Sequence, residues 1–481
     1  MAKSLAELAS ILGLQPQSTW ARIKIEGICE DTRRLRPGDL FVAIPGHDED
    51  GCDFIARAID RGAIAVLSEE SANLPVPVLK TKCTRAALSQ LSAVFYDHPT
   101  RELFTIGVTG TNGKTTTCHW TADLLERSET LLVSTVRNRI LAISGLTTPP
   151  SPIIQQVARD AVDDGTHNLI LEASSAGIAQ DRVSNIDFDA CVFTNFSPEH
   201  LSHHSGLAAY RSAKLKLFES LKAEAWAILN ADDPMHSDFV AATSARVLTF
   251  GIDAGADLRA EDIQLMARSS RFTVVAHAEE AETVIVPLSG RHNIFNALAA
   301  IAVGVVKGMP LSLMAERLAQ VRPIPGRAQY FRRVDGLVAV VDFAHNPSSL
   351  KAILTSLRSE HSRIIVLFGC PGDGEHEKRV AMGKVAGRWA DAVVLTSDNP
   401  KNEDARAIAS EIRTGIGSSP VPVTIVLDRR SAVQLALSRA KAGDVVLLAG
   451  KGHETEQLVG DERVSFSDAE ALKELGFTEG D

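Results

Sequence analysis

The sequence predicts an α/β protein built of three domains. Its length of 481 residues suits about three domains of ordinary size. In two separate stretches, short apolar strands alternate with longer helical patterns, which is typical of mostly parallel sheets covered by helices. Hydrophobic residues make up 45% of the chain and charged residues 23%, which excludes a disordered chain, a collagen-like repeat and a disulfide-based miniprotein. We expect domains at residues 1–100, 101–325 and 326–481.

The first hundred residues predict a mixed α/β domain. They open with an amphipathic helix, and Glu7 interrupts its apolar stretch, unlike the core of a signal peptide. An Arg-Pro-Gly-Asp turn precedes a buried strand over residues 40–44. Apolar side chains at helical spacing predict a helix over residues 54–59, and the prolines of residues 74–79 favour an extended chain.

Two further sets of strands predict a central parallel-sheet domain and a C-terminal Rossmann-like domain. The central strands are expected at residues 103–109, 168–172, 190–195, 226–230 and 247–250. A more antiparallel insertion should follow them, and a segment with two prolines and a glycine near residue 325 indicates a boundary. The C-terminal strands are expected at residues 338–342, 363–369, 392–396, 423–427 and 444–449.

Charge and cysteine content exclude several partners. Fifty Lys and Arg against 60 Asp and Glu give a formal net charge of −10, which argues against nucleic acid or an anionic membrane as the main partner. The six cysteines show no CxxC pair, which favours reduced thiols over a zinc site or disulfides. No apolar run approaches the ~20 residues that a membrane span needs. We therefore expect a cytoplasmic, monomeric protein.

The most informative segment is IGVTGTNGKTTT, residues 106–117. It follows an apolar strand and opens a helix, which is the setting of a phosphate-binding loop. Gly110 and Gly113 let successive backbone N–H groups face an anion, and the helix N-terminus adds a favourable dipole. Val108 stands where an ordinary Walker A loop has its first glycine. The alternative interpretation is a glycine-rich turn followed by a surface lysine.

The loop predicts ATP and Mg²⁺ as ligands. Lys114 should reach the β- and γ-phosphates, and the Thr115 hydroxyl should bind Mg²⁺. Glu172 ends a predicted strand, so its carboxylate should lie at the sheet edge where ligands collect. The residues expected to bind the nucleotide from the loop are Gly110, Thr111, Asn112, Gly113, Lys114, Thr115 and Thr116.

The GTNGKT form of this loop resembles that of the ATP-dependent Mur ligases, relatives of folylpolyglutamate synthetase that join a carboxylate to an amine. The resemblance covers nearly the whole chain and is nearest to the UDP-N-acetylmuramoyl-tripeptide synthetases, the branch that adds the third residue of the peptidoglycan stem peptide. The stretches that carry it, in family order, are DTRRLRPGDLFVAIPGHDEDG, TTP, EASSAGIAQDRV, FTNFSPEHLSHH, YRSAKLKLF, GRHNIFNALAA, PGR, VDFAHNP, FGCPGDGEHEKR, SDNPKNE and AGKGHETEQ. It implies that ATP converts a carboxylate to an acyl phosphate, which an amine then displaces.

The resemblance also implies roles for single residues. Glu172, His200 and a carbamylated Lys214 would hold Mg²⁺ with Thr115, and Arg327 would neutralise the γ-phosphate. Other nucleotide-binding positions match Asn293, Asn296 and Asp342, the last of which could bond the ribose. By residue type alone, a histidine of this kind is usually structural and a lysine on an amphipathic helix is usually solvated. His203 and His204 remain unassigned.

Two substrates beside ATP follow from the resemblance. Hydroxyls, amides and arginine suit the pyrophosphate and carboxylates of UDP-N-acetylmuramoyl-dipeptide. The positions that match contacts to it are Thr32, Arg33, His47, Thr147, Thr148, Ser174, Gln180 and Arg182. The positions that match contacts to the incoming amino acid are Arg379, Asp398, Asn399, Lys401, Gly450 and Glu454.

Several positions depart from the family pattern. Lys401 replaces the arginine that follows Asp-Asn-Pro in diaminopimelate enzymes, and a lysine lacks the bidentate fork of arginine. Ala176 stands where the family has His, Glu199 where Asp is usual, and Ala328-Gln329 where Met-Glu often follows PGR. A basic residue at position 401 still favours meso-diaminopimelate over lysine. The alternatives are a paralogue acting on another carboxylate or amino acid, and a nucleotide-binding scaffold without activity.

Overall fold

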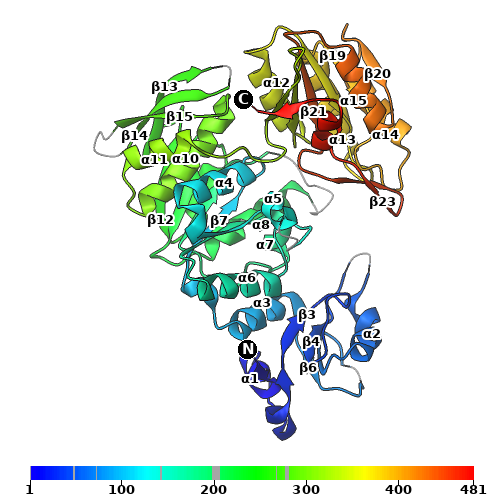
Figure 1. The fold of residues 1–481 in the computed structure, drawn as a ribbon. Coiled ribbons are helices and arrows are strands. Elements are labelled where there is room, and N and C mark those ends of the chain that lie inside the picture. Colours follow the sequence, from blue (N-terminus) through cyan, green and yellow to red (C-terminus); the bar gives the residue numbers. More distant parts are fainter. Residues whose placement is uncertain are drawn as a thin grey trace.

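The computed structural model describes residues 2–46, 49–71, 73–140, 144–197, 206–266, 268–276 and 281–480. Across these residues the chain forms three units, each built on its own parallel or mostly parallel sheet. We name them the N-terminal unit (strands β1–β6), the central unit (β7–β15) and the C-terminal unit (β16–β24). Figure 1 shows the central unit between the other two.

The N-terminal unit is a small mixed α/β layer. Its main sheet has the order β3-β4-β5-β6 with all neighbours parallel, and β1 pairs with β2 beside it. The strands are β1 Lys3–Ser4, β2 Lys24–Ile25, β3 Gly27–Cys29, β4 Asp39–Val42, β5 Ala65–Ser68 and β6 Val78–Lys80. The helices are α1 Leu5–Ile11, α2 Ile55–Asp60 and α3 Thr84–Phe95, with 3₁₀ turns at Ser18–Arg22, Gly51–Phe54 and Pro99–Arg101.

The central sheet has the strand order β15-β14-β13-β12-β11-β10-β7-β9-β8. Strands β7 to β12 are parallel, whereas β13, β14 and β15 pair antiparallel with one another. The strands are β7 Phe104–Thr109, β8 Thr130–Val133, β9 Asn168–Glu172, β10 Ala190–Phe193, β11 Trp226–Asn230, β12 Arg246–Gly251, β13 Leu258–Leu265, β14 Ser270–Val275 and β15 Ala281–Val286. Because β8 and β9 lie on one side of β7 and β10 on the other, β7 ends where the strand order reverses, the position at which parallel sheets bind ligands.

Helices cover both faces of the central sheet. Helices α4 and α10 pack into one apolar core, and α6 and α8 contribute to a second core on the other face. The helices of this unit are α4 Lys114–Leu124, α5 Thr135–Ile140, α6 Ser151–Asp163, α7 Ser175–Ala179, α8 Leu207–Glu219, α9 His236–Ala242, α10 Arg291–Val306 and α11 Leu311–Ala319, with a 3₁₀ turn at Arg127–Glu129. The phosphate loop is thereby fixed between a buried strand and a buried helix.

The C-terminal unit is a second wound sheet with the order β20-β19-β18-β21-β17-β16-β24. Strands β17 to β21 are parallel, and β16 runs antiparallel to β17 and β24. The strands are β16 Gln329–Arg332, β17 Val338–Asp342, β18 Ile364–Phe368, β19 Ala392–Leu395, β20 Val423–Ile425, β21 Val445–Ala449 and β24 Thr478–Glu479, with a separate hairpin of β22 Glu456–Val459 and β23 Glu462–Ser465. The helices are α12 Pro347–Arg358, α13 His376–Trp389, α14 Ala405–Ile416, α15 Arg429–Ser438 and α16 Asp468–Glu474.

The predicted α/β class and the alternation of strands and helices are confirmed, including the antiparallel insertion. The strand expected over residues 40–44 ends at Val42, and several strands were not foreseen, among them β5, β8, β16, β24 and the hairpin of β22 and β23. Among the described residues, no helix has the length and apolar content needed to cross a bilayer.

Candidate active site

The phosphate loop joins β7 to α4 through two glycines that other residues cannot replace. Gly110 has φ +146° and Gly113 has φ +84°, both in the region that L side chains rarely adopt. A Cβ at Gly110 would overlap Thr194 Oγ1, and one at Gly113 would overlap Asn296 Oδ1. The loop therefore owes its shape to glycine at both points.

Lys114 and Thr115 begin α4 at the mouth of the loop. Lys114 Nζ donates to the carbonyls of Gly110 at 3.0 Å and Thr111 at 2.9 Å. Thr115 Oγ1 lies 3.1 Å from each carboxylate oxygen of Glu172, at the C-terminal end of β9. The structure thus brings these predicted residues together.

Glu172 is nearly fully buried, with 2% of its surface exposed, and it receives further hydrogen bonds. The Thr135 backbone N–H and hydroxyl both donate to its Oε2 at 3.0 Å. Hydroxyl and carboxylate oxygens are the ligand types that Mg²⁺ prefers. A buried carboxylate with a threonine hydroxyl beside a phosphate loop therefore fits the expected magnesium site.

Arg327 reaches this site from the start of the C-terminal unit. Its Nη2 donates to Thr115 Oγ1 at 3.0 Å, and its guanidinium lies 4.7 Å from the centre of the Phe343 ring. Burial lowers the pKa of Arg327, and the charges of Asp342 and Glu172 oppose that shift. A cation at this place can neutralise charge that develops on a phosphoryl group.

Lys214 lies on α8, beneath the loop. Its side chain is buried, with 1% of the residue exposed, and its Nζ donates to Gly110 O at 2.8 Å. The ammonium lies 4.6 Å from the ring centre of Tyr210, whose hydroxyl is 3.0 Å from Thr111 Oγ1. Helix α8 therefore contacts the phosphate loop through both Tyr210 and Lys214, and the predicted carbamate would form on an amine at the loop.

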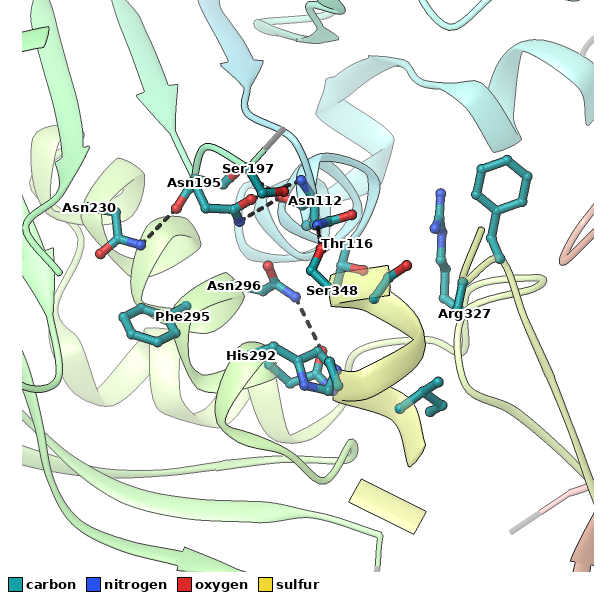
Figure 2. Close-up of a pocket in the computed structure, with 18 of the residues that line it drawn as sticks. Asn112, Thr116, Asn195, Ser197, Asn230, His292, Phe295, Asn296, Arg327 and Ser348 are labelled. Atoms are coloured by element: carbon teal, nitrogen blue, oxygen red, sulfur yellow. Dashed lines mark hydrogen bonds between the residues drawn. The ribbon is translucent and has the colours of Figure 1, made fainter. Parts of the chain in front are cut away.

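A cavity of about 410 Å³ opens on one side of the loop, between the central and C-terminal units (Figure 2). Asn296 Nδ2 donates to Asn293 Oδ1 at 3.2 Å, and both lie in its wall. Burial lowers the pKa of His292 to about 4, so this lining imidazole is neutral at pH 7. The cavity has the position and mixed lining expected for a nucleoside.

Asp342 lies in the same wall, at the end of β17. Its carboxylate accepts hydrogen bonds from the backbone N–H of Ala328 at 2.7 Å and of Ala344 at 2.8 Å. Burial raises its pKa, and the nearby guanidinium of Arg327 counteracts that effect. The structure thus places Asp342 where it shapes the turn around Arg327 as well as lining the cavity.

A second cavity of about 450 Å³ lies on the other side of the loop. Predicted substrate residues meet there: Thr148 Oγ1 donates to Glu172 O at 2.8 Å and lies 2.9 Å from Ser174 Oγ. The Thr147 hydroxyl lies 3.0 Å from the Thr135 hydroxyl. Predicted residues in its lining are Thr111, Asn112, Gly113, Lys114, Thr115, Thr116, Thr147, Thr148, Glu172, Ser174, Gln180, Arg182 and Arg327.

A third cavity of about 510 Å³ lies between the N-terminal and central units. Thr32 and Arg33 line it from the N-terminal side, and Gln180 and Arg182 line both it and the second cavity. Arg182 Nη1 donates to Thr148 O at 2.8 Å. Burial lowers the pKa of Arg182, and the negative charge of Glu30 opposes that shift. The two cavities therefore share a wall, and together they lead from the N-terminal unit to the phosphate loop.

The residues predicted to bind the amino acid lie in the C-terminal unit, where Arg379 and Glu454 are already paired with other side chains. Arg379 is buried, with 1% of its surface exposed, and its two terminal nitrogens each donate to Glu403 at 2.6 Å. Glu454 Oε2 accepts from Lys451 Nζ at 2.8 Å and from Asn399 Nδ2 at 3.0 Å. A substrate must exchange partners with these groups.

Lys401 and Asp398 differ from those pairs. Lys401 has φ +51°, its side chain is 41% exposed, and its Nζ lies 3.8 Å from Asp373 Oδ2. Asp398 is buried, which raises its pKa, and Lys451 and Arg429 oppose that shift. Gly450 has φ +103°, and a Cβ there would lie 2.7 Å from Asp398 Oδ2, so this glycine permits the close approach.

Comparison with known proteins identifies the family. Profiles described as the Mur ligase family catalytic domain, the Mur ligase middle domain and the Mur ligase glutamate ligase domain match residues 24–100, 108–304 and 326–452. The UDP-N-acetylmuramoyl-L-alanyl-D-glutamate--2,6-diaminopimelate ligase of Bacillus licheniformis is 36% identical over 461 residues, which cover 93% of this chain and 94% of that protein. The chain belongs to the Mur ligase family.

Two further Mur ligases extend this comparison. The ligase of the same name from Geobacillus thermodenitrificans is 37% identical over 454 residues, covering 91% of this chain and 92% of its own. A solved structure of a UDP-N-acetylmuramoyl-L-alanyl-D-glutamate--2,6-diaminopimelate ligase matches with a TM-score of 0.65, 28% identity and 98% coverage of both chains.

Sequence reasoning did not single out several residues that shape this Mur ligase site. Thr135 donates a hydrogen bond to Glu172. The Asn112 side chain is hydrogen-bonded to Asn346 and to Ser348. Lys451 donates to Asn399, within the Asp-Asn-Pro cluster. Asn346 and Lys451 stand inside the quoted stretches VDFAHNP and AGKGHETEQ, which were the available signal. His47 and His200, together with Glu199, His203 and His204, lie outside the described residues.

Proposed function

We propose that the chain is an ATP-dependent, ADP-forming ligase that joins meso-diaminopimelate to UDP-N-acetylmuramoyl-L-alanyl-D-glutamate in peptidoglycan synthesis. The observation that carries the proposal is the chain of cavities: a nucleoside-sized cavity on one side of the phosphate loop and two joined cavities on the other. The curated relatives at 36% and 37% identity bear the name of this reaction.

In this proposal the three units correspond to domains at residues 1–100, 101–325 and 326–481. The N-terminal cavity takes the UDP end through Thr32 and Arg33, with His47 expected nearby. Arg182 and Gln180 hold the middle of the substrate, and Thr147, Thr148 and Ser174 direct its terminal carboxylate toward the loop. Arginine and hydroxyl donors suit the pyrophosphate and carboxylates of this substrate.

ATP lies across the loop with its base in the cavity beside Asn293, Asn296 and Asp342. The loop N–H groups from Gly110 to Thr116 and the Lys114 ammonium bind the phosphates. When bound, Mg²⁺ would be held by Thr115 and Glu172, with His200 and a carbamylated Lys214 as further ligands, and would offset phosphate charge.

The reaction proceeds in two displacements. A carboxylate oxygen of the D-glutamate attacks the γ-phosphorus, and the bond from that phosphorus to ADP breaks. Arg327 stabilises the charge on the transferring group. The amine of the amino acid then attacks the acyl carbon, phosphate leaves and the amine loses a proton. Arg379, Asp398, Asn399, Lys401, Gly450 and Glu454 position that amino acid. We place this reaction in the cytoplasm, in a monomer.

The test is phosphate release by the purified protein with ATP, Mg²⁺, UDP-N-acetylmuramoyl-L-alanyl-D-glutamate and a panel of amino acids. Release that requires both the UDP substrate and diaminopimelate supports the proposal. Release only with other carboxylates or amines would instead identify a paralogue, the alternative that the replacements at positions 401, 176 and 328 suggest. No release under any condition would identify an inactive nucleotide-binding scaffold.

A further inference from the structure

The side chain of Asn112 bridges the central and C-terminal units. Its Oδ1 accepts a hydrogen bond from Asn346 Nδ2 at 2.9 Å, and its Nδ2 donates to Ser348 Oγ at 2.9 Å. Figure 2 shows Ser348 at the start of α12, facing Asn112. Both groups of the Asn112 amide therefore contact the C-terminal unit.

The backbone of Asn112 is fixed within the central unit. Its N–H donates to Asn195 Oδ1 at 3.0 Å, and its carbonyl accepts from Thr194 Oγ1 at 2.7 Å. Thr194 and Asn195 follow β10, which pairs directly with β7. The bridge thus connects α12 to the rigid part of the phosphate loop.

Asn346 has two functions, which different atoms perform. Its Oδ1 caps α12 by accepting from the Ser349 N–H at 2.8 Å, and its Nδ2 makes the contact with Asn112. An aspartate caps a helix as well as an asparagine does. The cap therefore needs only the side-chain oxygen of Asn346, and the side-chain amino group makes the hydrogen bond to the central unit.

The bridge closes the nucleoside cavity, whose wall includes Asn112 and Gly113 from the loop and Ser348 and Ser349 from α12. The hydrogen bond from Arg327 to Thr115 crosses the same boundary and ends on the same loop. The C-terminal unit also carries the amino-acid cluster around Asp398. One relative position of the two units consequently serves both ATP and the amino acid.

We propose that Asn346 and Ser348 are positioning residues that latch the C-terminal unit onto the phosphate loop and so set the apparent affinities for ATP and for the amino acid together. The apparent affinity of a ligand falls in proportion to the fraction of protein in the competent arrangement. The UDP substrate lies mainly against the N-terminal and central units and meets the C-terminal unit only near Arg327, Phe343 and His345, so its affinity should depend less on the latch. This inference rests on the proposed function for the identity of its substrates.

The decisive variant is Asn346→Asp, because it keeps the cap and replaces the donor with an oxygen that faces Asn112 Oδ1. Ser348→Ala removes the other contact, and Ser348→Thr restores its hydroxyl. Asp428→Asn is the matched control, since Asp428 caps α15 in the same unit through the Ser431 N–H at 2.8 Å. Melting temperature, the Kd of a non-hydrolysable ATP analogue by calorimetry and the three KM values are measured for each.

We expect Asn346→Asp and Ser348→Ala to raise the Kd of the ATP analogue and the KM of the amino acid by a similar factor, roughly three- to thirtyfold. The KM of the UDP substrate should rise by a clearly smaller factor and the melting temperature should stay unchanged, and Ser348→Thr and Asp428→Asn should behave as the unaltered protein.

Unchanged nucleotide affinity in both variants would overturn the latch, as would an equal rise for all three substrates or a large loss of stability in Asn346→Asp. If the unaltered protein binds the analogue yet releases no phosphate, the proposed function fails. In that case the Kd values of the ATP analogue, measured by calorimetry, still test whether Asn346 and Ser348 act as the latch.

Discussion

The phosphate loop and the amino-acid cluster are built by different means. Around the loop, backbone groups and short hydroxyl side chains make most of the contacts, as between Thr115, Thr135 and Glu172. In the cluster, long charged side chains pair with one another, as Arg379 does with Glu403. To bind phosphate, the Lys114 ammonium turns away from two carbonyls of its own loop, whereas the cluster must give up ion pairs.

This difference predicts how the two regions respond to mutation. The loop geometry is fixed before ATP arrives, so removal of a charged group there removes an interaction that nothing replaces. When a substrate replaces one partner of an ion pair, the free energy of the new contact is largely offset by the loss of the old one. Such an exchange contributes more to selectivity than to affinity. Loss of function should therefore be large at the loop and graded in the cluster.

The largest effect is expected for Lys114→Ala. Without the ammonium, the charge of the transferring phosphoryl group is poorly neutralised, and phosphate release should fall by about 10³- to 10⁵-fold. The melting temperature should hardly change, because the carbonyls to which Lys114 Nζ donates, those of Gly110 and Thr111, belong to its own loop. Unchanged phosphate release would show that this segment does not bind the ATP phosphates.

The next largest effect is expected for Lys214→Ala. If a carbamate on Lys214 supports Mg²⁺, turnover should fall by about 10²- to 10³-fold, and bicarbonate or a short carboxylic acid should restore part of it. Lys216→Ala is the matched control, because Lys216 lies on the same helix with its side chain 48% exposed and paired to Asp181. Full activity of Lys214→Ala would eliminate the carbamate.

In the cluster, Lys401→Ala should raise the KM for diaminopimelate roughly ten- to a hundredfold, since one charge-assisted contact contributes about 1.5–3 kcal/mol. Lys401→Arg should keep or improve that KM. Both variants keep a Cβ at φ +51°, so their difference reports the long basic side chain and not the backbone conformation. Lys384→Ala, on the exposed face of α13, is the control. Equal use of lysine and diaminopimelate by the unaltered protein would contradict this assignment.

The smallest effect is expected for Asp398→Asn, and it concerns stability. Burial raises the folded-state pKa of Asp398 above its ordinary value of 3.8, so the folded protein holds this proton more tightly than the unfolded chain does. The resulting stabilisation is complete below pH 3.8 and is lost as the pH rises through the raised pKa. An asparagine amide at this position stays neutral at every pH, so the variant does not lose this stabilisation as the pH rises.

Asp398→Asn should therefore increase the free energy of unfolding at pH 8 by a small amount, and the difference should vanish near pH 3.5. Denaturant titrations at both pH values measure it. A variant that is less stable at pH 8 would show that Lys451 and Arg429 outweigh burial at this carboxylate.

The sequence predicted the fold class and most strands, because their apolar runs and turn residues are local signals. It also placed Gly110, Gly113 and Lys114 in one loop and Glu172 at the end of a strand, and the structure brings Glu172 to Thr115. These residues follow neighbouring parallel strands, so topology alone brings them together.

The remaining contacts depend on the relative position of distant segments. Arg327 and Thr115 are 212 residues apart in the sequence, and no local pattern shows that they meet. Thr135 was missed because the strand before it, β8, is only the four residues Thr130–Val133 and was not foreseen. The pairing of Arg379 with Glu403 was likewise unforeseen, since either residue alone is a plausible substrate ligand.

The shared wall at Gln180 and Arg182 fixes the separation between the N-terminal cavity and the phosphate loop. For a substrate bound at its UDP end, this distance selects for the length of the attached peptide. A muramoyl precursor one residue too short would leave its carboxylate away from the γ-phosphate, and one too long would have no space for its last residue. The protein would then select its step in the growth of the stem peptide by length, before any amino acid is chosen.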